Sequence, residues 1–304
     1  MRLLKTKVLV TGALGLLGAN IVKQLKDDYN VLGLSRKIDV EGKETGVEYV
    51  QGDITKRKEI VDRVRHFHPK FIINAAAYTN VDRSEVEKDA CWQANVDGVK
   101  HLAYAAKLSE ARLVHISTDY VFDGIEGPYD EDDRPNPLGY YARSKLAGEN
   151  ELIASGADFA IARTMVLYGY AASSRLNFVT WVIEQLKNRA PITIVDDQFG
   201  NPTLADELAH AVIALAKSNE NGVFHISGNE IIDRYSFVLH IAHVFGLDKS
   251  LVSRIKTADL NQPAPRPLNS GFKVDKLSKR LGITMSNALE GLETFKLNYG
   301  SYIL

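Results

Sequence analysis

Short apolar runs alternate with amphipathic stretches along most of the chain. Runs such as residues 7–10 and 71–73 are too short for a helix and are typical of strands buried on both faces of a sheet. The stretches between them repeat apolar residues at intervals of three and four, which predicts helices. We predict strands at residues 7–10, 31–34, 47–50, 71–73, 112–116, 160–163, 192–195 and 223–226, and helices through 21–25 and at 85–108, 138–149, 177–186, 204–217, 234–245 and 287–299.

The first predicted strand runs into a glycine-rich turn, TGALGLLG, at residues 11–18. Gly12, Gly15 and Gly18 let the backbone turn sharply and approach a pyrophosphate, which would sit at the N-terminus of the helix that Leu16 and Leu17 open. A plain turn between a strand and a helix seldom needs three glycines at this spacing. The turn therefore predicts a dinucleotide site.

The end of the second predicted strand bears on the choice of dinucleotide. Units that bind NAD usually place an acid there to hold the ribose 2′-hydroxyl, whereas this chain has Ser35 and Arg36. A hydroxyl and a guanidinium suit a 2′-phosphate, which favours NADP and leaves NAD possible. The alternative is that Arg36 is simply a solvated residue after a strand.

Small or polar residues follow the next two predicted strands. Asp53 and Ile54 follow the third strand, and Ala75, Ala76 and Ala77 follow the fourth. Small residues at the carboxyl end of a parallel strand let a flat ligand lie close, and ligands bind at those ends in open α/β sheets. Helix–sheet packing is the alternative role for the alanines.

Candidate chemistry is concentrated on the helix after Pro137. Proline cannot sit inside a helix, so the helix should begin after it, and Tyr141 and Lys145 then share one face. A nearby ammonium favours the phenolate and lowers the pKa of a tyrosine, which makes the pair a proton donor or acceptor. A core tyrosine and a solvated lysine would be the ordinary interpretation. We reject it because the chain also supplies a dinucleotide turn and, at the end of the fifth strand, the Thr118 hydroxyl.

Composition narrows the function classes. The chain has 304 residues, 45% hydrophobic and 25% charged, with a formal net charge of −1. Neither nucleic acid nor a membrane is indicated as a partner, since no basic excess and no membrane-length apolar run are present. The single cysteine, Cys91, excludes an internal disulfide, and residues 1–7 contain no apolar leader, so we expect a cytoplasmic protein. His240 and His243 share a helix face without a further ligand at zinc spacing, and no metal site is predicted.

The motifs in their order resemble the extended short-chain dehydrogenase/reductase superfamily. Within it, the chain resembles the dTDP-4-dehydrorhamnose reductase family over nearly its whole length. The shared motifs are TGxxGxxG at 11–18, NAAAYTxVD at 74–82, STDYVF at 117–122, Tyr141-x-x-x-Lys145, KLAGE at 145–149, DQxGxPT at 197–203 and RPxNS at 266–270.

The resemblance implies a role for each matching residue. Thr118, Tyr141 and Lys145 would be catalytic, with Asp119, Tyr120, Asn177 and Gln198 joining Thr118 around the substrate. The implied reaction is NADPH-dependent reduction of a nucleotide-linked 4-keto-6-deoxy sugar, most simply dTDP-4-dehydrorhamnose to dTDP-rhamnose. The cofactor contacts would be Gly12, Gly15, Leu16, Leu17, Gly18, Ser35, Arg36, Asp53, Ile54, Ala75, Ala76, Ala77, Tyr141 and Lys145. A homodimer is possible.

Two departures from the family pattern leave questions open. Val166 stands where members commonly carry a tryptophan that touches the sugar, so either Tyr78, Tyr120 or Tyr168 compensates or the sugar differs. Asn20 replaces a glutamate that contributes to an interfacial magnesium site in some members.

Two rival functions share the same motifs. A nucleotide-sugar epimerase or dehydratase of the same fold is one, since Asp119 follows Thr118 as acids do in dehydratases. A non-catalytic NADP-binding regulatory subunit is the other, because the FHxSGNE run at 224–230 and the missing tryptophan resemble the methionine adenosyltransferase β subunit.

The fold class that these observations predict is α/β, with a Rossmann-type doubly wound parallel sheet and a smaller mixed α/β lobe. Residues 1–163 plus about 201–227 would form the NADP-binding domain. About 164–200 plus 228–304 would form the substrate-binding lobe.

Overall fold

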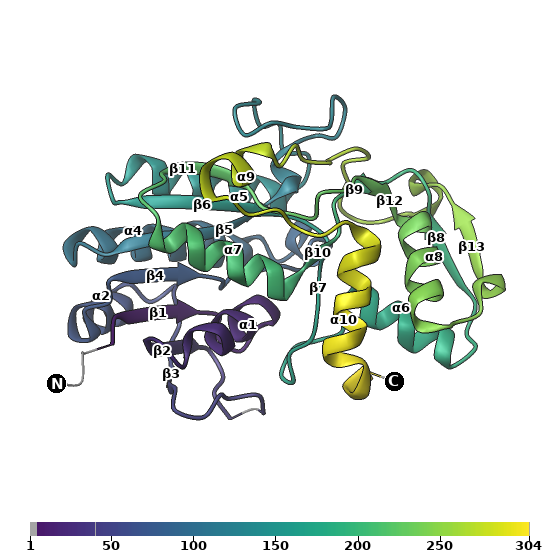
Figure 1. Cartoon of the computed structure of the whole chain (residues 1–304). Helices are drawn as coiled ribbons and strands as arrows, with labels where there is room; N and C mark the ends of the chain where they lie inside the picture. Colours follow the sequence, from purple (N-terminus) through teal and green to yellow (C-terminus); the bar gives the residue numbers. More distant parts are fainter. Residues whose placement is uncertain (1–4, 40, 304) are drawn as a thin grey trace.

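The computed structural model describes residues 5–39 and 41–303, and Figure 1 shows a larger and a smaller lobe side by side. Residues 1–4 belong to the N-terminal stretch in which we expect no leader, and they lie outside the described residues, as do residues 40 and 304.

A seven-stranded sheet forms the centre of the larger lobe. Its order is β11-β6-β5-β4-β1-β2-β3, and every neighbouring pair is parallel. The order reverses between β1 and β4, and open α/β sheets bind ligands at the carboxyl ends of the strands at such a point. The prediction of a doubly wound parallel α/β fold is confirmed. The strands are β1 (Lys7–Thr11), β2 (Asn30–Ser35), β3 (Glu48–Gln51), β4 (Phe71–Asn74), β5 (Arg112–Thr118), β6 (Phe159–Thr164) and β11 (Gly222–His225).

Helices bury both faces of this sheet. One apolar core joins the sheet to α1 (Leu16–Leu25), α7 (Ala205–Lys217) and α9 (Asp275–Leu281). A second joins its other face to α2 (Arg57–Phe67), α4 (Gly98–Leu108) and α5 (Tyr140–Ala154). Strands covered on both sides are apolar throughout, which explains the continuous runs in the sequence.

The smaller lobe has a core of its own. Its helices are α6 (Phe178–Lys187), α8 (Arg234–Phe245) and α10 (Ala288–Ile303), whose apolar faces meet around Phe237 and Phe295. Parallel strands β8 (Ile192–Val195) and β13 (Val252–Ile255) line its outer side (Figure 1). Two short pairs lie near the larger lobe: β7 (Leu167–Tyr168) with β10 (Thr203–Leu204), and β9 (Phe199–Gly200) with β12 (Ile232–Asp233).

One predicted helix is divided in the structure. Residues 85–108 form a 3₁₀ turn at Arg83–Glu85, helix α3 at Lys88–Trp92, a π-helical turn at Gln93–Asp97, and α4. The wider π turn brings the Asn95 carbonyl against α5, where a Cβ on Gly148 would lie 2.1 Å from that oxygen. Apolar spacing continues through this break, so the sequence pattern does not reveal it.

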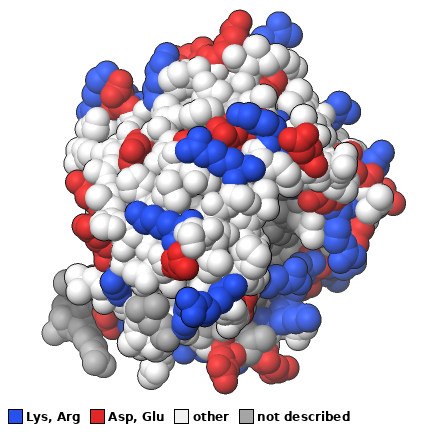
Figure 2. Space-filling model, turned by 90° about the vertical axis from the view of Figure 1, so that its right-hand side faces the viewer, with Lys and Arg blue, Asp and Glu red and all other residues white. Residues whose placement is uncertain are grey.

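No helix among residues 5–39 and 41–303 is both long and apolar enough to cross a membrane. Figure 2 shows Lys and Arg side chains interspersed with Asp and Glu on the face of the smaller lobe.

Candidate active site

The three predicted catalytic residues come together at the carboxyl edge of the sheet. Thr118 ends β5, and Tyr141 and Lys145 lie in the first turns of α5. The start of α5 is fixed from outside, because the backbone N–H of Tyr140 donates to Glu85 Oε1 at 2.7 Å and that of Tyr141 to Ser84 Oγ at 3.1 Å. These bonds satisfy N–H groups that a helix cannot satisfy itself.

Tyr141 is half-buried beside two side chains from the end of β5. Its ring lies edge-on to Tyr120, with ring centroids 5.9 Å apart. Burial raises its pKa above the usual value, while a hydrogen bond with the Thr118 side chain acts in the opposite direction. The sequence argument expected Lys145 to lower this pKa. In the protein alone burial dominates, and Tyr141 is held as a protonated phenol.

Lys145 is almost fully buried, at 2% exposure. Its Nζ donates to the Ile116 carbonyl at 2.7 Å and lies 3.3 Å from His115 Nε2. Burial lowers its pKa to about 8, against the opposing effects of Glu149 and Cys91. The ammonium is thus turned toward the floor of the site, formed by β5.

Asp119 occupies a buried position next to the Thr118 hydroxyl. It accepts hydrogen bonds from Ser270 Oγ at 2.6 Å and from Thr118 Oγ1 at 3.0 Å. Burial raises its pKa to about 6, and the two hydroxyls oppose that shift. The carboxylate therefore orients the Thr118 hydroxyl and ties β5 to the segment around Ser270.

A proline-rich segment closes the site over Tyr141. Pro265 and Pro267 line a narrow crevice with Tyr120, Tyr141 and Leu138. Between the prolines, Arg266 pairs with Asp82, with Nη1–Oδ1 at 2.5 Å and Nη2–Oδ2 at 2.8 Å. This two-point bridge holds the segment against the β4 side of the site.

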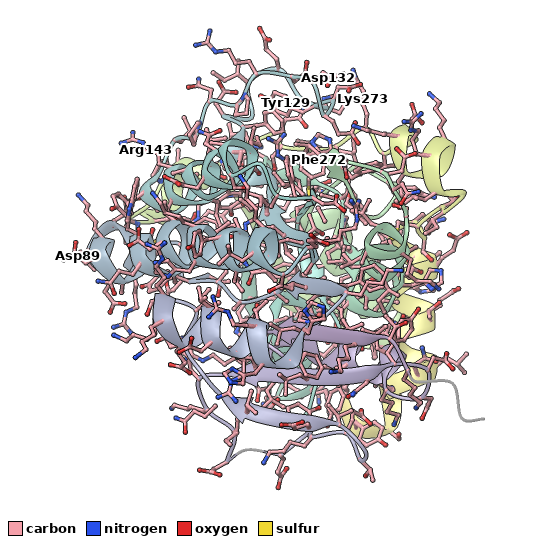
Figure 3. All side chains as sticks on the ribbon, turned by 90° about the vertical axis from the view of Figure 1, so that its left-hand side faces the viewer. Asp89, Tyr129, Asp132, Arg143, Phe272 and Lys273 are labelled. Carbon is pink, nitrogen blue, oxygen red and sulfur yellow. The ribbon has the colours of Figure 1, made fainter. Side chains whose placement is uncertain are left out.

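The acidic loop at residues 126–137 lies elsewhere. Tyr129 is buried, and the backbone N–H of Lys273 donates to its carbonyl at 2.8 Å. Figure 3 shows Tyr129 close to Phe272, with Asp132 and Lys273 near the same loop. The crevice beside Tyr141 is lined by Pro265 and Pro267, and no residue of the loop lines it.

The glycine turn has the shape that a dinucleotide phosphate requires. A Cβ on Gly18 would lie 2.1 Å from the Gly12 carbonyl oxygen, and one on Gly12 would lie 2.8 Å from the Ala75 backbone. Gly15 caps α1 without a side-chain acceptor, and the first turn holds no acid. The N–H groups of Leu16 and Leu17 therefore have no side-chain acceptor at the helix terminus, where an anion would be favoured.

The other predicted cofactor contacts are distributed around this edge. Ser35 ends β2 half-buried and Arg36 is exposed directly after it, where a 2′-phosphate could reach the guanidinium. Asp53 caps its own turn by accepting from the Thr55 N–H at 2.9 Å, and Ile54 is buried against Gly98. Ala75, Ala76 and Ala77 are half-buried at the end of β4, beside Gly12.

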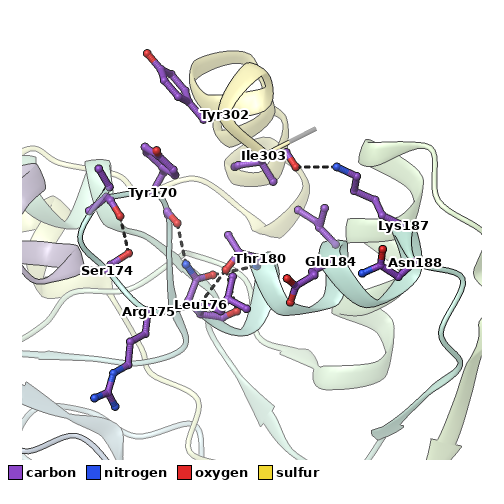
Figure 4. Close-up of a pocket in the computed structure, with 15 residues that line it drawn as sticks. Tyr170, Ser174, Arg175, Leu176, Thr180, Glu184, Lys187, Asn188, Tyr302 and Ile303 are labelled. Atoms are coloured by element: carbon purple, nitrogen blue, oxygen red, sulfur yellow. Dashed lines mark hydrogen bonds between the residues drawn. The ribbon is translucent and has the colours of Figure 1, made fainter. Parts of the chain in front are cut away.

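Two predicted substrate residues use their side chains in hydrogen bonds within the protein. Asn177 caps α6 and donates to the Gly169 carbonyl at 2.8 Å. It lines a cavity of about 410 Å³ between the 169–177 loop, α6 and the end of α10, and none of the three predicted catalytic residues lines that cavity (Figure 4). Gln198 donates to Thr257 Oγ1 at 3.0 Å, and its carbonyl accepts from the Arg234 N–H.

The two departures from the family pattern have local consequences. Val166 has a φ of 45°, a left-handed conformation that strains a β-branched residue. Of the aromatic residues that could compensate, Tyr120 lies against Tyr141, whereas Tyr168 is buried in the core of the smaller lobe and Tyr78 bonds Glu87 at 2.6 Å. Asn20 is also buried and donates to the Leu16 and Tyr170 carbonyls.

Three residues near the site escaped the sequence argument. Asn95 donates to Ser144 Oγ at 2.9 Å and accepts from the Tyr78 N–H, which joins α5 to the loop after β4. Arg234 starts α8 with its guanidinium over the Phe178 ring, 5.0 Å from the centroid. His115 lies under Lys145. The sequence alone did not mark them, because their roles depend on contacts with residues far away along the chain.

Among the residues that the structure describes, no group of three or more His, Cys, Asp or Glu side chains could hold a metal ion.

Comparison with known proteins gives one consistent result. The family model of the RmlD substrate-binding domain matches residues 6–299. The chain is 34% identical to a dTDP-4-dehydrorhamnose reductase of Aggregatibacter actinomycetemcomitans, covering 95% of this chain and 98% of that protein. It is 35% identical to the spore coat polysaccharide biosynthesis protein SpsK of Bacillus subtilis, over 87% and 88% of the two chains. The crystal structure of a Bacillus anthracis dTDP-4-dehydrorhamnose reductase in complex with NADP superposes with a TM-score of 0.89, at 32% identity and over 97% and 100% of the chains.

Proposed function

This chain belongs to the RmlD substrate-binding-domain family, and from that membership we propose that it is an NADPH-dependent reductase of a nucleotide-linked 4-keto-6-deoxy sugar. The substrate that its relatives favour is dTDP-4-dehydrorhamnose, with dTDP-rhamnose as the product. The observation that carries the proposal is the Thr118, Tyr141 and Lys145 set at the same sheet edge as the glycine turn.

The glycine turn and the ends of β2 and β4 would hold the cofactor. Gly12, Gly15 and Gly18 leave room for the pyrophosphate, and the N–H groups at the start of α1 suit its charge. Arg36 suits the 2′-phosphate of NADP, and the structure of one relative contains NADP. Bound NADPH would supply the hydride.

The side chains of this chain would supply the proton and the orientation. Tyr141 stays protonated because burial raises its pKa, and its hydroxyl would donate a proton to the substrate oxygen. Thr118 would turn its single O–H from Asp119 Oδ1 to the substrate oxygen, and that hydrogen bond would strengthen as negative charge develops. Lys145 would hold the nicotinamide ribose and exchange a proton with the site.

Arg234 supports a substrate that carries a diphosphate. Its guanidinium makes no hydrogen bond with any residue in the described part of the chain. Its positive charge is close enough to Asp119 and Tyr120 to favour their ionised forms. Burial lowers its pKa, so an anionic partner would be strongly favoured there. The substrate-binding role of Asp119 and Tyr120 is proposed on the same ground.

One assay separates this function from its rivals. Purified protein is mixed with NADPH and a panel of 4-keto sugar nucleotides, and both NADPH and the sugar are followed. A reductase consumes one NADPH for each sugar, whereas an epimerase or dehydratase converts sugar without net consumption. A regulatory subunit does neither, and either of these last two results would overturn the proposal.

A variant tests the assigned acid. Tyr141→Phe keeps the ring and removes the proton, so kcat should fall by about 10²–10⁴-fold while NADPH still binds. Near-normal turnover would show that Tyr141 is not the acid.

A further inference from the structure

A chain of buried polar side chains runs beneath the site, from β1 through β4 and β5 to α5. Thr11 Oγ1 donates to Asn74 Oδ1 at 2.6 Å. Asn74 Nδ2 lies 2.9 Å from His115 Nδ1, and His115 Nε2 lies 3.3 Å from Lys145 Nζ. All four side chains are between 0 and 2% exposed, so water cannot substitute for any of these contacts.

The backbone fixes the orientation of Asn74. The N–H of Ala76 donates to Asn74 Oδ1 at 3.2 Å, and a backbone N–H can only donate. A flipped amide would set two donors against each other there. The Asn74 amide nitrogen therefore faces His115.

That orientation selects the tautomer of His115. Because Asn74 Nδ2 is a donor, His115 Nδ1 must accept, and the ring proton of the neutral imidazole must be on Nε2. Burial and the charge of Lys145 lower the pKa of His115 well below its ordinary value, so the ring is neutral. The Nε2–H consequently points at Lys145 Nζ.

The two protonation states of Lys145 meet this N–H differently. An ammonium has three donors and no acceptor, so it would oppose the Nε2–H, whereas a neutral amine has a lone pair that accepts it. The second contact, to the Ile116 carbonyl, is satisfied by one N–H in either state. We propose that His115 is a positioning residue that, held as the Nε2–H tautomer by Asn74, stabilises the neutral amine form of Lys145.

The other charged groups around Lys145 do not provide this effect. Glu149 lies one turn along α5 and Cys91 faces the lysine from α3, and both favour the ammonium. Glu149 is itself paired with Arg163 of β6. Burial opposes the charge of Lys145, and the His115 N–H, 3.3 Å from Nζ, would act in the same direction.

The consequence for catalysis rests on the proposed function. Reduction transfers one proton from Tyr141 to the substrate oxygen in each turnover, and that proton must be replaced from solvent. A lysine that titrates near the working pH can take up and give back a proton, whereas one with an ordinary pKa remains an ammonium. His115 would therefore adjust Lys145 for proton resupply.

Nitrogen-15 NMR of the protein without substrate tests the tautomer directly. The wild-type spectrum should show the His115 proton on Nε2. In Asn74→Asp the new carboxylate accepts from Nδ1–H, which should move the proton to Nδ1. A wild-type ring protonated on Nδ1 would overturn the proposal.

A double-mutant cycle then tests the effect on Lys145, whose pKa is followed through labelled lysine and assigned with Lys145→Met. Reversing the tautomer turns Nε2 into an acceptor, so Asn74→Asp should raise the Lys145 pKa by about one unit or more. In the His115→Phe background the same substitution should raise the Lys145 pKa much less, since only the charge of the carboxylate introduced at position 74 then acts on the lysine, and from a greater distance. Equal shifts in both backgrounds, or none in either, would refute the role of His115.

The matched control is His101→Phe, a half-buried histidine of α4 that contacts the Ile54 carbonyl, and it should leave the Lys145 pKa unchanged. Active variants should also show the alkaline limb of the kcat–pH profile displaced toward higher pH in Asn74→Asp. Because the NMR measurements need no turnover, they remain informative if the protein proves not to be a reductase. Conversely, reduction of the sugar with an unaltered Lys145 pKa would reject only the role of His115.

Discussion

The ion pair between Glu149 and Arg163 should contribute strongly to stability. Their side chains are 1% and 4% exposed, and Arg163 Nε and Nη2 donate to Oε1 and Oε2 at 3.0 and 2.6 Å. Glu149→Gln keeps the size of the side chain and removes its charge. The guanidinium would then remain buried between β6 and α5 without a counter-ion.

Removing one partner of such a buried pair costs about 3–5 kcal/mol. A change of that size shifts the folding equilibrium by roughly 10²–10⁴-fold. For a chain of this length it should lower the melting temperature by roughly 6–20 °C. The same substitution should lower the pKa of Lys145 further, because Glu149 raises it in the native protein.

Urea unfolding measures the loss in free energy of unfolding, provided that its dependence on urea concentration is the same for each variant. The control is Glu151→Gln on the same helix, which breaks an exposed pair with Lys100 at 3.2 Å, with side chains 36% and 60% exposed. That change should cost no more than about 1 kcal/mol. If Glu149→Gln lost less than the control, or the two variants were equal, the argument from desolvation would be wrong.

Three further predictions concern the cofactor, the π turn and a second buried histidine. Arg36→Ala should weaken NADPH by about 1.5–3 kcal/mol and leave NADH almost unaffected, as measured by fluorescence titration; equal weakening would count against NADP. Gly148→Ala should cost on the order of 2–3 kcal/mol in urea unfolding, since the added methyl meets the Asn95 carbonyl at 2.1 Å, and an unchanged midpoint would contradict this. His225 is stacked on Phe272, and burial lowers its pKa to about 3. Between pH 6.5 and 3 the unfolded chain binds a proton at His225 that the native state does not, so the free energy of unfolding should fall by about 1.4 kcal/mol for each pH unit by which the pH is lowered. His225→Phe should remove this contribution. Wild-type and variant stability profiles that stay parallel over this pH range would refute the prediction.

The sequence predicted the main sheet because its signals are local. Buried strands appear as continuous apolar runs, and the three glycines of the turn satisfy a backbone requirement that is visible in any single stretch. Tyr141 and Lys145 were found for a similar reason, since helical periodicity alone places them together. The match to the reductase family confirms the superfamily and the fold class.

Features that depend on contacts between distant segments could not be predicted in this way. The direction of the Tyr141 pKa follows from burial under Pro265 and Pro267, which lie more than a hundred residues further along the chain. The π turn depends on the close approach of Gly148, and the role of His115 depends on Asn74 in another strand. The site residues themselves stay predictions until variants are measured.

The contacts that complete the site join segments that are synthesised at different times. Asp119 and Ser270 are separated by 151 positions, and Asp82 and Arg266 by 184. At roughly 5–20 residues per second, about 8–30 s pass on the ribosome between the addition of Asp119 and that of Ser270. The segments that carry Tyr141 and Lys145 therefore exist well before the residues that cover them. A nascent chain arrested before residue 263 would leave Tyr141 without the prolines and the arginine bridge that shield it from solvent in the finished protein.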